Sequence, residues 1–272
     1  PWDKPMYVKR AWCVFETLAA LDARVKREVV FPPSEREKLV AVMRTDQFGH
    51  STLMQIFGDV NVARCEAANA VDRDAILALI GKRTDVNDAV MGPLKAFYCD
   101  VMVAAVGKMP GVTKEEGMAF SAVAALFYVL GDLDAALPWF NKALVAHRHP
   151  GSGSEERDVA TALNNIASCL SDQGKYDEAI KVHRESLAIF KRALGDHHPD
   201  VATSLGNIAS CLSEQGKFDE ALKLHYEALA VKKRALGDDH PSTATTLNNI
   251  ASCLHAQGKY DEALKYNHEA LA

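Results

Sequence analysis

A repeat with a fixed period fills the second half of the chain, and this periodicity constrains the fold more than any other sequence feature. Residues 160–201 align without gaps on residues 202–243, with 29 of 42 positions identical. A third copy runs from Ala244 to Ala272 and matches the first at 21 of 29 positions. Residues 119–147 hold a divergent earlier copy. Such a period is typical of units that stack into an array, because one unit cannot bury its apolar face alone.

Each copy predicts two helices. In the first helix, Leu163, Ile166, Ala167 and Leu170 recur at helical spacing and form one apolar stripe. Small side chains, Ala167 and Ala179, stand where the two helices must cross closely. Helices are expected to begin at Pro199 and Pro241 and to end before Gly174, Gly195, Gly216, Gly237 and Gly258.

These residues resemble the tetratricopeptide repeat (TPR), whose pattern of apolar, small and Gly-x-aromatic positions is matched by Leu163, Ala167, Leu170, Gly174, Tyr176, Ala179 and Leu187. The 42-residue period, the LNNIA opening and the RALGD-x-HP linker are similar to the long-period repeats of kinesin light chains. No sustained heptads precede the repeats, so the resemblance does not extend to kinesin attachment. It implies a right-handed superhelix whose concave wall, lined by the first helices, holds a peptide segment of a partner protein.

The predicted fold class is therefore mostly α, an α-solenoid of stacked TPR hairpins after a smaller α/β or mainly helical segment. The array is expected over residues 115–272, with repeats at 115–149, 158–195, 200–237 and 242–272. Residues 1–110 are expected to form the smaller segment. The predicted function is a protein interaction scaffold.

Placing the ligand-facing positions of TPR proteins on this sequence predicts polar columns on the first helices. The candidate binding residues are Thr161, Asn164, Asn165, Ser168 and Asp172, then Thr203, Asn207, Ser210 and Glu214, then Thr245, Asn248, Asn249 and Ser252. Asparagine amides both donate and accept, so a ladder of them can bind a peptide backbone. The columns hold no Lys or Arg, which disfavours a clamp for a terminal carboxylate. The alternative interpretation is a merely solvated helix face.

Cysteine and histidine residues recur in the repeats but favour packing roles. Cys169, Cys211 and Cys253 occur once per repeat, too far apart to share a zinc ion. His183 and His225 occupy the position of Phe140 in the divergent copy. We therefore expect no metal and no cofactor. The six widely spaced cysteines favour reduced thiols and a cytoplasmic location.

The run RAWCVFE at residues 10–16 resembles a helix of Toll/interleukin-receptor-like (TIR) domains, in which a glutamate at the position of Glu16 is catalytic in NAD-cleaving members. Arg10 replaces the usual serine, and the first strands of such a fold would precede Pro1, so the module is expected to be truncated and inactive. An enzyme is not the favoured prediction. The alternative is a TIR-like NAD-cleaving enzyme or signalling protein whose repeats act as a sensor or assembly scaffold.

Charge and hydropathy exclude other classes of partner. The chain carries 31 basic and 36 acidic residues, and a net charge of −5 argues against nucleic acid or anionic membrane as the main ligand. The longest uncharged stretch, residues 117–131, is too short to cross a bilayer. Because Leu264 and Leu271 have no later repeat to cover them, we expect further repeats or self-association at this end of a longer protein.

Overall fold

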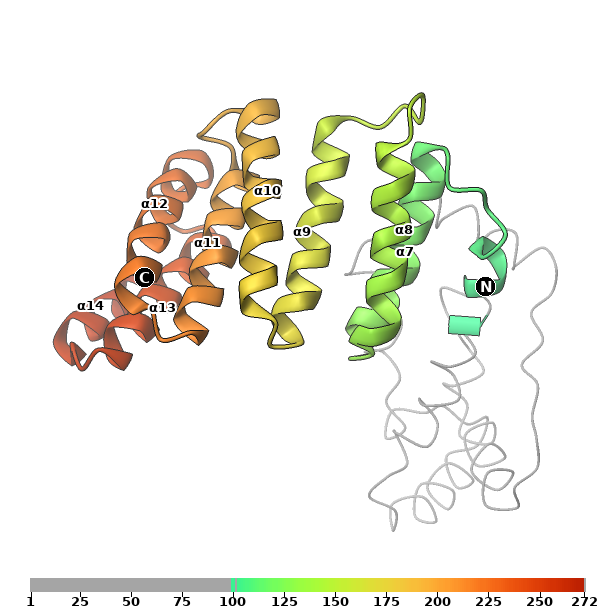
Figure 1. The fold of residues 1–272 in the computed structure, drawn as a ribbon. Coiled ribbons are helices and arrows are strands. Elements are labelled where there is room, and N and C mark those ends of the chain that lie inside the picture. Colours follow the sequence, from blue (N-terminus) through green and yellow to red (C-terminus); the bar gives the residue numbers. More distant parts are fainter. Residues whose placement is uncertain (1–98, 101, 272) are drawn as a thin grey trace, which may run out of the picture. The chain divides into compact units, whose positions relative to one another are not determined.

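The computed structural model describes residues 99–100 and 102–271, which form α-helices joined by short turns (Figure 1). The chain divides into two compact units, residues 1–110 with 118–136 and residues 111–117 with 137–272. The TIR-like module and Glu16 lie outside the described residues. The expected domain boundaries therefore stay a prediction.

Eight helices follow residue 110 in the described part of the chain. Their bounds are α7 (Lys114–Val129), α8 (Leu133–Arg148), α9 (Glu156–Asp172), α10 (Tyr176–Leu194), α11 (Pro199–Glu214), α12 (Phe218–Leu236), α13 (Pro241–Ala256) and α14 (Tyr260–Ala270). The helices α9 to α14 form the three similar copies of the sequence repeat. The mostly helical fold predicted for the repeats is confirmed.

The predicted helix starts are confirmed, and the structure adds a cap that the sequence interpretation missed. Pro199 and Pro241 are the first residues of α11 and α13. The Nδ1 atoms of His198 and His240 each accept a hydrogen bond, at 3.1 Å, from the backbone N–H two residues later. These imidazoles satisfy an N–H group that the helix itself leaves unpaired, as Ser or Asp does in other N-caps.

Glycines with positive φ follow the first helix of each copy. Gly174, Gly216 and Gly258 have φ values of 76°, 75° and 78°. This left-handed region strains residues that have a Cβ atom, so a glycine ends each helix and lets the chain reverse. The predicted helix ends are confirmed at these positions.

The predicted apolar stripe of α9 is the core of the first copy. Leu163, Ile166, Ala167 and Leu170 are 0–7% exposed. Ala167 and Ala179 are both fully buried, in agreement with a close crossing of α9 and α10. Small side chains at the crossing let the larger ones interlock beside it.

One apolar cluster joins the first copy to the second. It consists of Ala160, Phe190, Val201, Ala202, Leu205, Ala228 and Val231, which come from α9, α10, α11 and α12. Stacking therefore buries residues that a single hairpin would expose. By contrast, Tyr260 and Leu264 of α14 and Leu271, which follows that helix, are 63%, 56% and 85% exposed within the described part of the chain.

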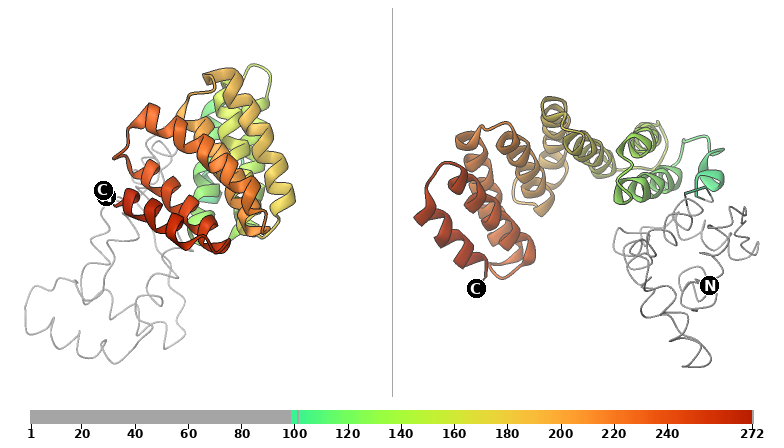
Figure 2. Two further views of the ribbon diagram at one scale, coloured as in Figure 1. Left: turned by 90° about the vertical axis from the view of Figure 1, so that its left-hand side faces the viewer. Right: turned by 90° about the horizontal axis from the view of Figure 1, so that it is seen from below.

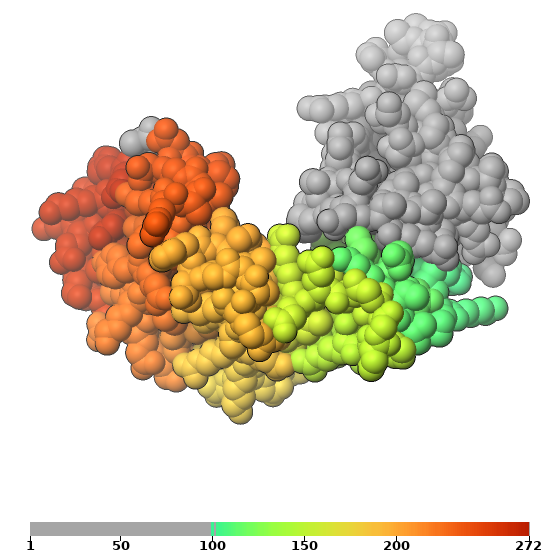
Figure 3. All heavy atoms as spheres, turned by 90° about the horizontal axis from the view of Figure 1, so that it is seen from above, coloured from blue at the N-terminus to red at the C-terminus, as the bar shows by residue number. Residues whose placement is uncertain are grey.

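Consecutive helices contact one another from α9 through α14 (Figure 2). The space-filling view shows the yellow helices of the first copy in continuous contact with the orange helices of the second (Figure 3). The first helices also contact each other in order, α9 with α11 and α11 with α13. These three helices therefore lie along one side of the stack.

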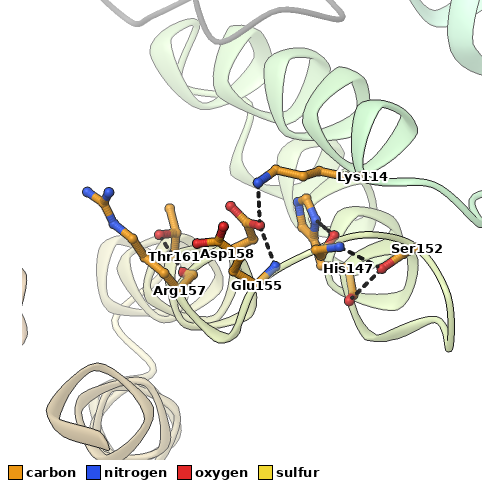
Figure 4. Close-up of polar contacts among 8 residues, drawn as sticks. Lys114, His147, Ser152, Glu155, Arg157, Asp158 and Thr161 are labelled. Carbon is orange, nitrogen blue, oxygen red and sulfur yellow. Dashed lines mark hydrogen bonds and ion pairs between the residues drawn. The ribbon is translucent and has the colours of Figure 1, made fainter. Parts of the chain in front are cut away.

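A polar network fixes the connection that leads into α9 (Figure 4). Asp158 Oδ2 lies 2.9 Å from Lys114 Nζ and accepts a hydrogen bond from the Glu155 backbone N–H at 2.7 Å. Lys114 also donates its backbone N–H to the Ser152 carbonyl at 2.9 Å. The ring Nδ1 of His147 lies 2.8 Å from Ser154 Oγ. These contacts hold the linker in place before α9, the first helix of the three similar copies.

Of the helices that the structure describes, none combines the length and the apolar character needed to cross a membrane.

Candidate functional site

Most of the predicted binding residues lie on one face each of α9, α11 and α13, and we call this set of residues the polar face. It consists of Thr161, Asn165, Ser168 and Asp172 with their equivalents Thr203, Asn207, Ser210, Glu214, Thr245, Asn249 and Ser252. Spacings of three and four residues place such side chains on one face of a helix. All of them are exposed or half-buried, whereas the apolar stripe of the same helices is buried.

Hydroxyl groups at the edge of the polar face bond to their own helix. Thr161, Thr203 and Thr245 donate to the carbonyl four residues earlier, at 2.9, 3.0 and 2.9 Å. Ser210 and Ser252 do the same at 3.0 Å. Their protons are thus engaged, and their oxygen atoms remain able to accept a hydrogen bond from a ligand.

Asparagine side chains in the polar face differ in what they contact. The side chains of Asn165 and Asn249 are half-buried and make no hydrogen bond within the described part of the chain. Asn248 is exposed. Asn207, in contrast, donates from Nδ2 to Asn164 Oδ1 at 3.1 Å, which links α11 to α9.

Asn164 is the centre of a hydrogen-bonded bridge between three helices. Its Oδ1 accepts from Asn207 and also lies 3.1 Å from Nδ1 of His183 on α10. Since Oδ1 can only accept, His183 carries its proton on Nδ1. The sequence placed Asn164 among the ligand-binding residues, and the structure shows that its amide oxygen is already occupied by the fold.

The two repeat histidines are more buried than their predicted packing role required. His183 and His225 are each 1% exposed. Burial lowers the pKa of each imidazole to about 4, with Lys232 a smaller contribution at His225. Both rings are therefore neutral at physiological pH.

The second copy has the same histidine without its partner. Gly206 stands at the position of Asn164, 42 residues later, and Nδ1 of His225 is buried with no hydrogen-bond partner in the described structure. A Cβ atom built on Gly206 would meet no atom within 4 Å. Gly206 was not among the predicted binding residues, although the LGNIA sequence at residues 205–209 departs visibly from the LNNIA pattern of the other copies.

Side-chain pairs recur at each joint between copies. Gln215 Nε2 donates to Asp177 Oδ1 at 2.9 Å, and Gln257 Nε2 donates to Asp219 Oδ1 at 2.8 Å. Two buried cysteines contact a serine of the preceding copy. These pairs are Cys211 with Ser171 at 3.3 Å and Cys253 with Ser213 at 3.0 Å. Burial raises the pKa of Cys211, which suits an unreactive packing thiol.

The second joint replaces an aromatic contact by a buried ammonium group. Phe190 packs in the apolar cluster of the first joint, and Lys232 occupies the equivalent position in the second. Lys232 Nζ donates to Thr246 Oγ1 at 2.8 Å and to the Ser242 carbonyl at 3.2 Å. Burial lowers the pKa of this lysine. The joints are therefore similar in backbone but different in polarity.

Among the described side chains, no three His, Cys, Asp or Glu residues gather closely enough to hold a metal ion. The chemistry that the polar face offers is hydrogen bonding by neutral amides and hydroxyls, with Asp172 and Glu214 as exposed carboxylates.

Comparisons with known proteins agree with this architecture. A family model described as "Tetratricopeptide repeat" matches residues 158–234 and 205–272. No curated protein sequence matches the chain significantly.

Solved structures share the fold at low sequence identity. A Podosopora anserina protein described as a kinesin light chain with nearly identical TPR-like repeats is 16% identical, with a TM-score of 0.55 over 66% of this chain and 86% of its own. BtubC (BKLC) from P. vanneervenii is 21% identical, with a TM-score of 0.54 over 86% and 89%. Aspartyl phosphate phosphatase F from Bacillus subtilis is 14% identical, with a TM-score of 0.55 over 90% and 76%.

Proposed function

Because residues 158–272 are tetratricopeptide repeats, we propose that this part of the chain is a protein interaction scaffold. Its polar face holds a peptide segment of a partner protein, and the stack supplies a rigid support for that contact. The observation that carries the proposal is the pair of half-buried amides, Asn165 and Asn249, that the fold itself does not use.

Amide side chains suit an extended peptide because each offers two donors and an acceptor. A peptide backbone presents N–H and C=O groups at regular intervals, so amides on successive repeats can pair with it whatever its side chains are. The hydroxyl oxygens of Thr161, Thr203 and Thr245 add acceptors to the polar face. Binding of this kind tolerates variation in the ligand sequence.

Charge on the polar face favours a particular kind of peptide. Asp172 and Glu214 are exposed, and none of the residues that form the polar face is Lys or Arg. A ligand with a basic side chain near these carboxylates gains attraction, whereas a terminal carboxylate finds no cation to pair with. We therefore expect captured peptides to be neutral or basic.

The test selects peptides from a random display library with the full chain and measures their affinity for variants. Replacing both Asn165 and Asn249 by Ala removes two hydrogen bonds of about 1 kcal/mol each, so the affinity should fall about 30-fold. Asn207 is replaced separately, because its loss also breaks the bond to Asn164. Affinity is read by fluorescence anisotropy of the labelled peptide.

Asn267→Ala is the matched control, since Asn267 is an exposed asparagine of α14 outside the polar face. It should leave the affinity unchanged. Unchanged affinity in the Asn165 and Asn249 double variant, with helix content preserved by circular dichroism, would refute the proposed use of the polar face.

A further inference from the structure

Two successive copies of the repeat place the same histidine in two different surroundings. In the first copy, Asn164 Oδ1 accepts a hydrogen bond from Asn207 and lies 3.1 Å from His183 Nδ1. In the second copy, the corresponding residues are Gly206, Asn249 and His225. The histidine and the asparagine are retained there, and the acceptor that joins them in the first copy is missing.

In the described part of the chain, the missing acceptor leaves both a buried ring nitrogen without a partner and open space. His225 is 1% exposed, and its Nδ1 has no partner in the described structure. Buried polar groups are satisfied in most proteins, and an unsatisfied one lowers stability. A Cβ atom built on Gly206 would meet no atom within 4 Å, and Gly206 itself is half-buried rather than sealed from solvent.

We propose that the space at Gly206 is a subsite that receives an amide carbonyl oxygen from the bound peptide, in the place that Asn164 Oδ1 fills in the preceding copy. This inference deepens the proposed function, because it names the ligand group that one part of the polar face recognises. His225 Nδ1–H and Asn249 Nδ2–H donate to that oxygen, as His183 and Asn207 donate to Asn164.

Chemistry selects an amide over a carboxylate at this subsite. The imidazole of His225 is buried and neutral, and Lys232 disfavours a second positive charge on it. A carboxylate would lose its hydration beside an imidazole that stays neutral, whereas an amide oxygen is neutral and needs only the two donors. The amide can belong to an Asn or Gln side chain or to the peptide backbone.

The first experiment uses acetamide, which reproduces the missing side chain of Asn164, and needs no peptide. Long-range ¹H–¹⁵N spectra of the full chain follow the ring nitrogens of His183 and His225 during the titration. Acetamide should shift the His225 signals saturably, with millimolar or weaker affinity because the ligand is so small. The His183 signals should stay in place, since Asn164 already occupies that position.

Two substitutions exchange the surroundings of the histidines. Gly206→Asn fills the space with its own amide, so His225 should no longer respond to acetamide. Asn164→Gly opens the equivalent space in the first copy, so His183 should become responsive. Either variant tests the inference if the other fails to fold. Absence of a His225 shift in the wild type, or the same shift in Gly206→Asn, would overturn the subsite.

The second experiment asks which amide the partner supplies. Peptides selected by the wild type should bind Gly206→Asn about tenfold more weakly. Enrichment of Asn or Gln at one position of the selected peptides identifies a side-chain amide. If all peptides lose affinity for Gly206→Asn to the same extent and no residue is enriched, the amide belongs to the peptide backbone. Equal peptide affinity in both proteins would overturn the peptide subsite. If no peptide is captured but acetamide shifts His225, the proposed function fails and the oxygen-binding site stands.

Discussion

Mild acid should destabilise the repeat stack through two buried histidines. Burial disfavours the charged ring, so the pKa of His183 and of His225 is about 4 in the folded chain, below the ordinary histidine value of 6.5. Between these values, the unfolded chain binds more protons than the folded chain. The free energy of unfolding is therefore highest above pH 6.5 and decreases as the pH falls towards 4.

Linkage converts this difference into a magnitude. At pH 5.5 both rings are still neutral in the folded state. In the unfolded state they are mostly protonated, because this pH is about one unit below the pKa of an unfolded histidine. Each pKa unit corresponds to about 1.4 kcal/mol. We therefore expect each histidine to lower the free energy of unfolding by about 1.4 kcal/mol at pH 5.5, and the two together by about 3 kcal/mol.

Urea unfolding of the full chain at several pH values between 7.5 and 5 measures this loss, with circular dichroism as the signal. The comparison protein carries His183→Phe and His225→Phe. Phe140 occupies the equivalent position in α8 and is only 3% exposed, so the repeat accommodates this ring. The double variant should lose less stability on acidification than the wild type, by about 3 kcal/mol at pH 5.5.

His197→Phe is the matched control, because His197 is exposed in the linker after α10. It should leave the acid sensitivity unchanged. His147 also has a pKa lowered by burial and contributes to the remaining slope in every variant. The reasoning is refuted if the double variant loses as much stability as the wild type between pH 7.5 and pH 5.5.

Three further contrasts test single contacts. Gly206→Ala should raise the free energy of unfolding by up to about 1 kcal/mol, since this glycine lies inside α11 with open space around it. Gly174→Ala should lower the free energy of unfolding by about 1 kcal/mol, because Gly174 has a φ of 76°. Opposite shifts of the urea midpoint are the expected result, and equal shifts would contradict it. Ser204→Ala should raise the melting temperature, by an amount that corresponds to about 1 kcal/mol in the free energy of unfolding, because the buried hydroxyl has no partner in the described structure. A lower melting temperature would indicate that the hydroxyl forms a hydrogen bond. Lys232→Met should raise the free energy of unfolding at pH 7 by about 1 kcal/mol, because burial disfavours the ammonium group and Thr246 keeps its bond to the Ser242 carbonyl. A lower free energy of unfolding, measured in urea, would show that the hydrogen bonds of the lysine outweigh the cost of burying it.

The repeat architecture could be predicted from the sequence because its causes are local. Pro199 and Pro241 set helix starts through a fixed φ, and Gly174, Gly216 and Gly258 set helix ends through a conformation that other residues avoid. The apolar stripe needs only helical spacing to be recognised. The near-identical copies repeat these local patterns, so successive copies form the same helices and leave little freedom in how the helices stack.

Candidate site residues were predicted less completely, because a sequence column does not show which side chains the fold has already engaged. Asn164, Asn165, Asn248 and Asn249 look alike in the sequence, yet only Asn164 lies between His183 and the next repeat. The caps formed by His198 and His240 were likewise hidden, because the Nδ1 atom serves as an acceptor only in the observed turn geometry.

By itself, the sequence determined the period, the helix pairs and the stripe that each helix buries, since these follow from residue spacing and backbone conformation. Only the tertiary structure decided how neighbouring copies meet. Asn164 Oδ1 contacts His183, 19 residues away on the next helix, and Asn207, 43 residues away in the next copy. In contrast, Nδ1 of His225 has no partner in the described structure, because Gly206 stands at the position of Asn164. A hydrogen bond depends on distances of tenths of an ångström between atoms on different helices, and no local pattern encodes those distances.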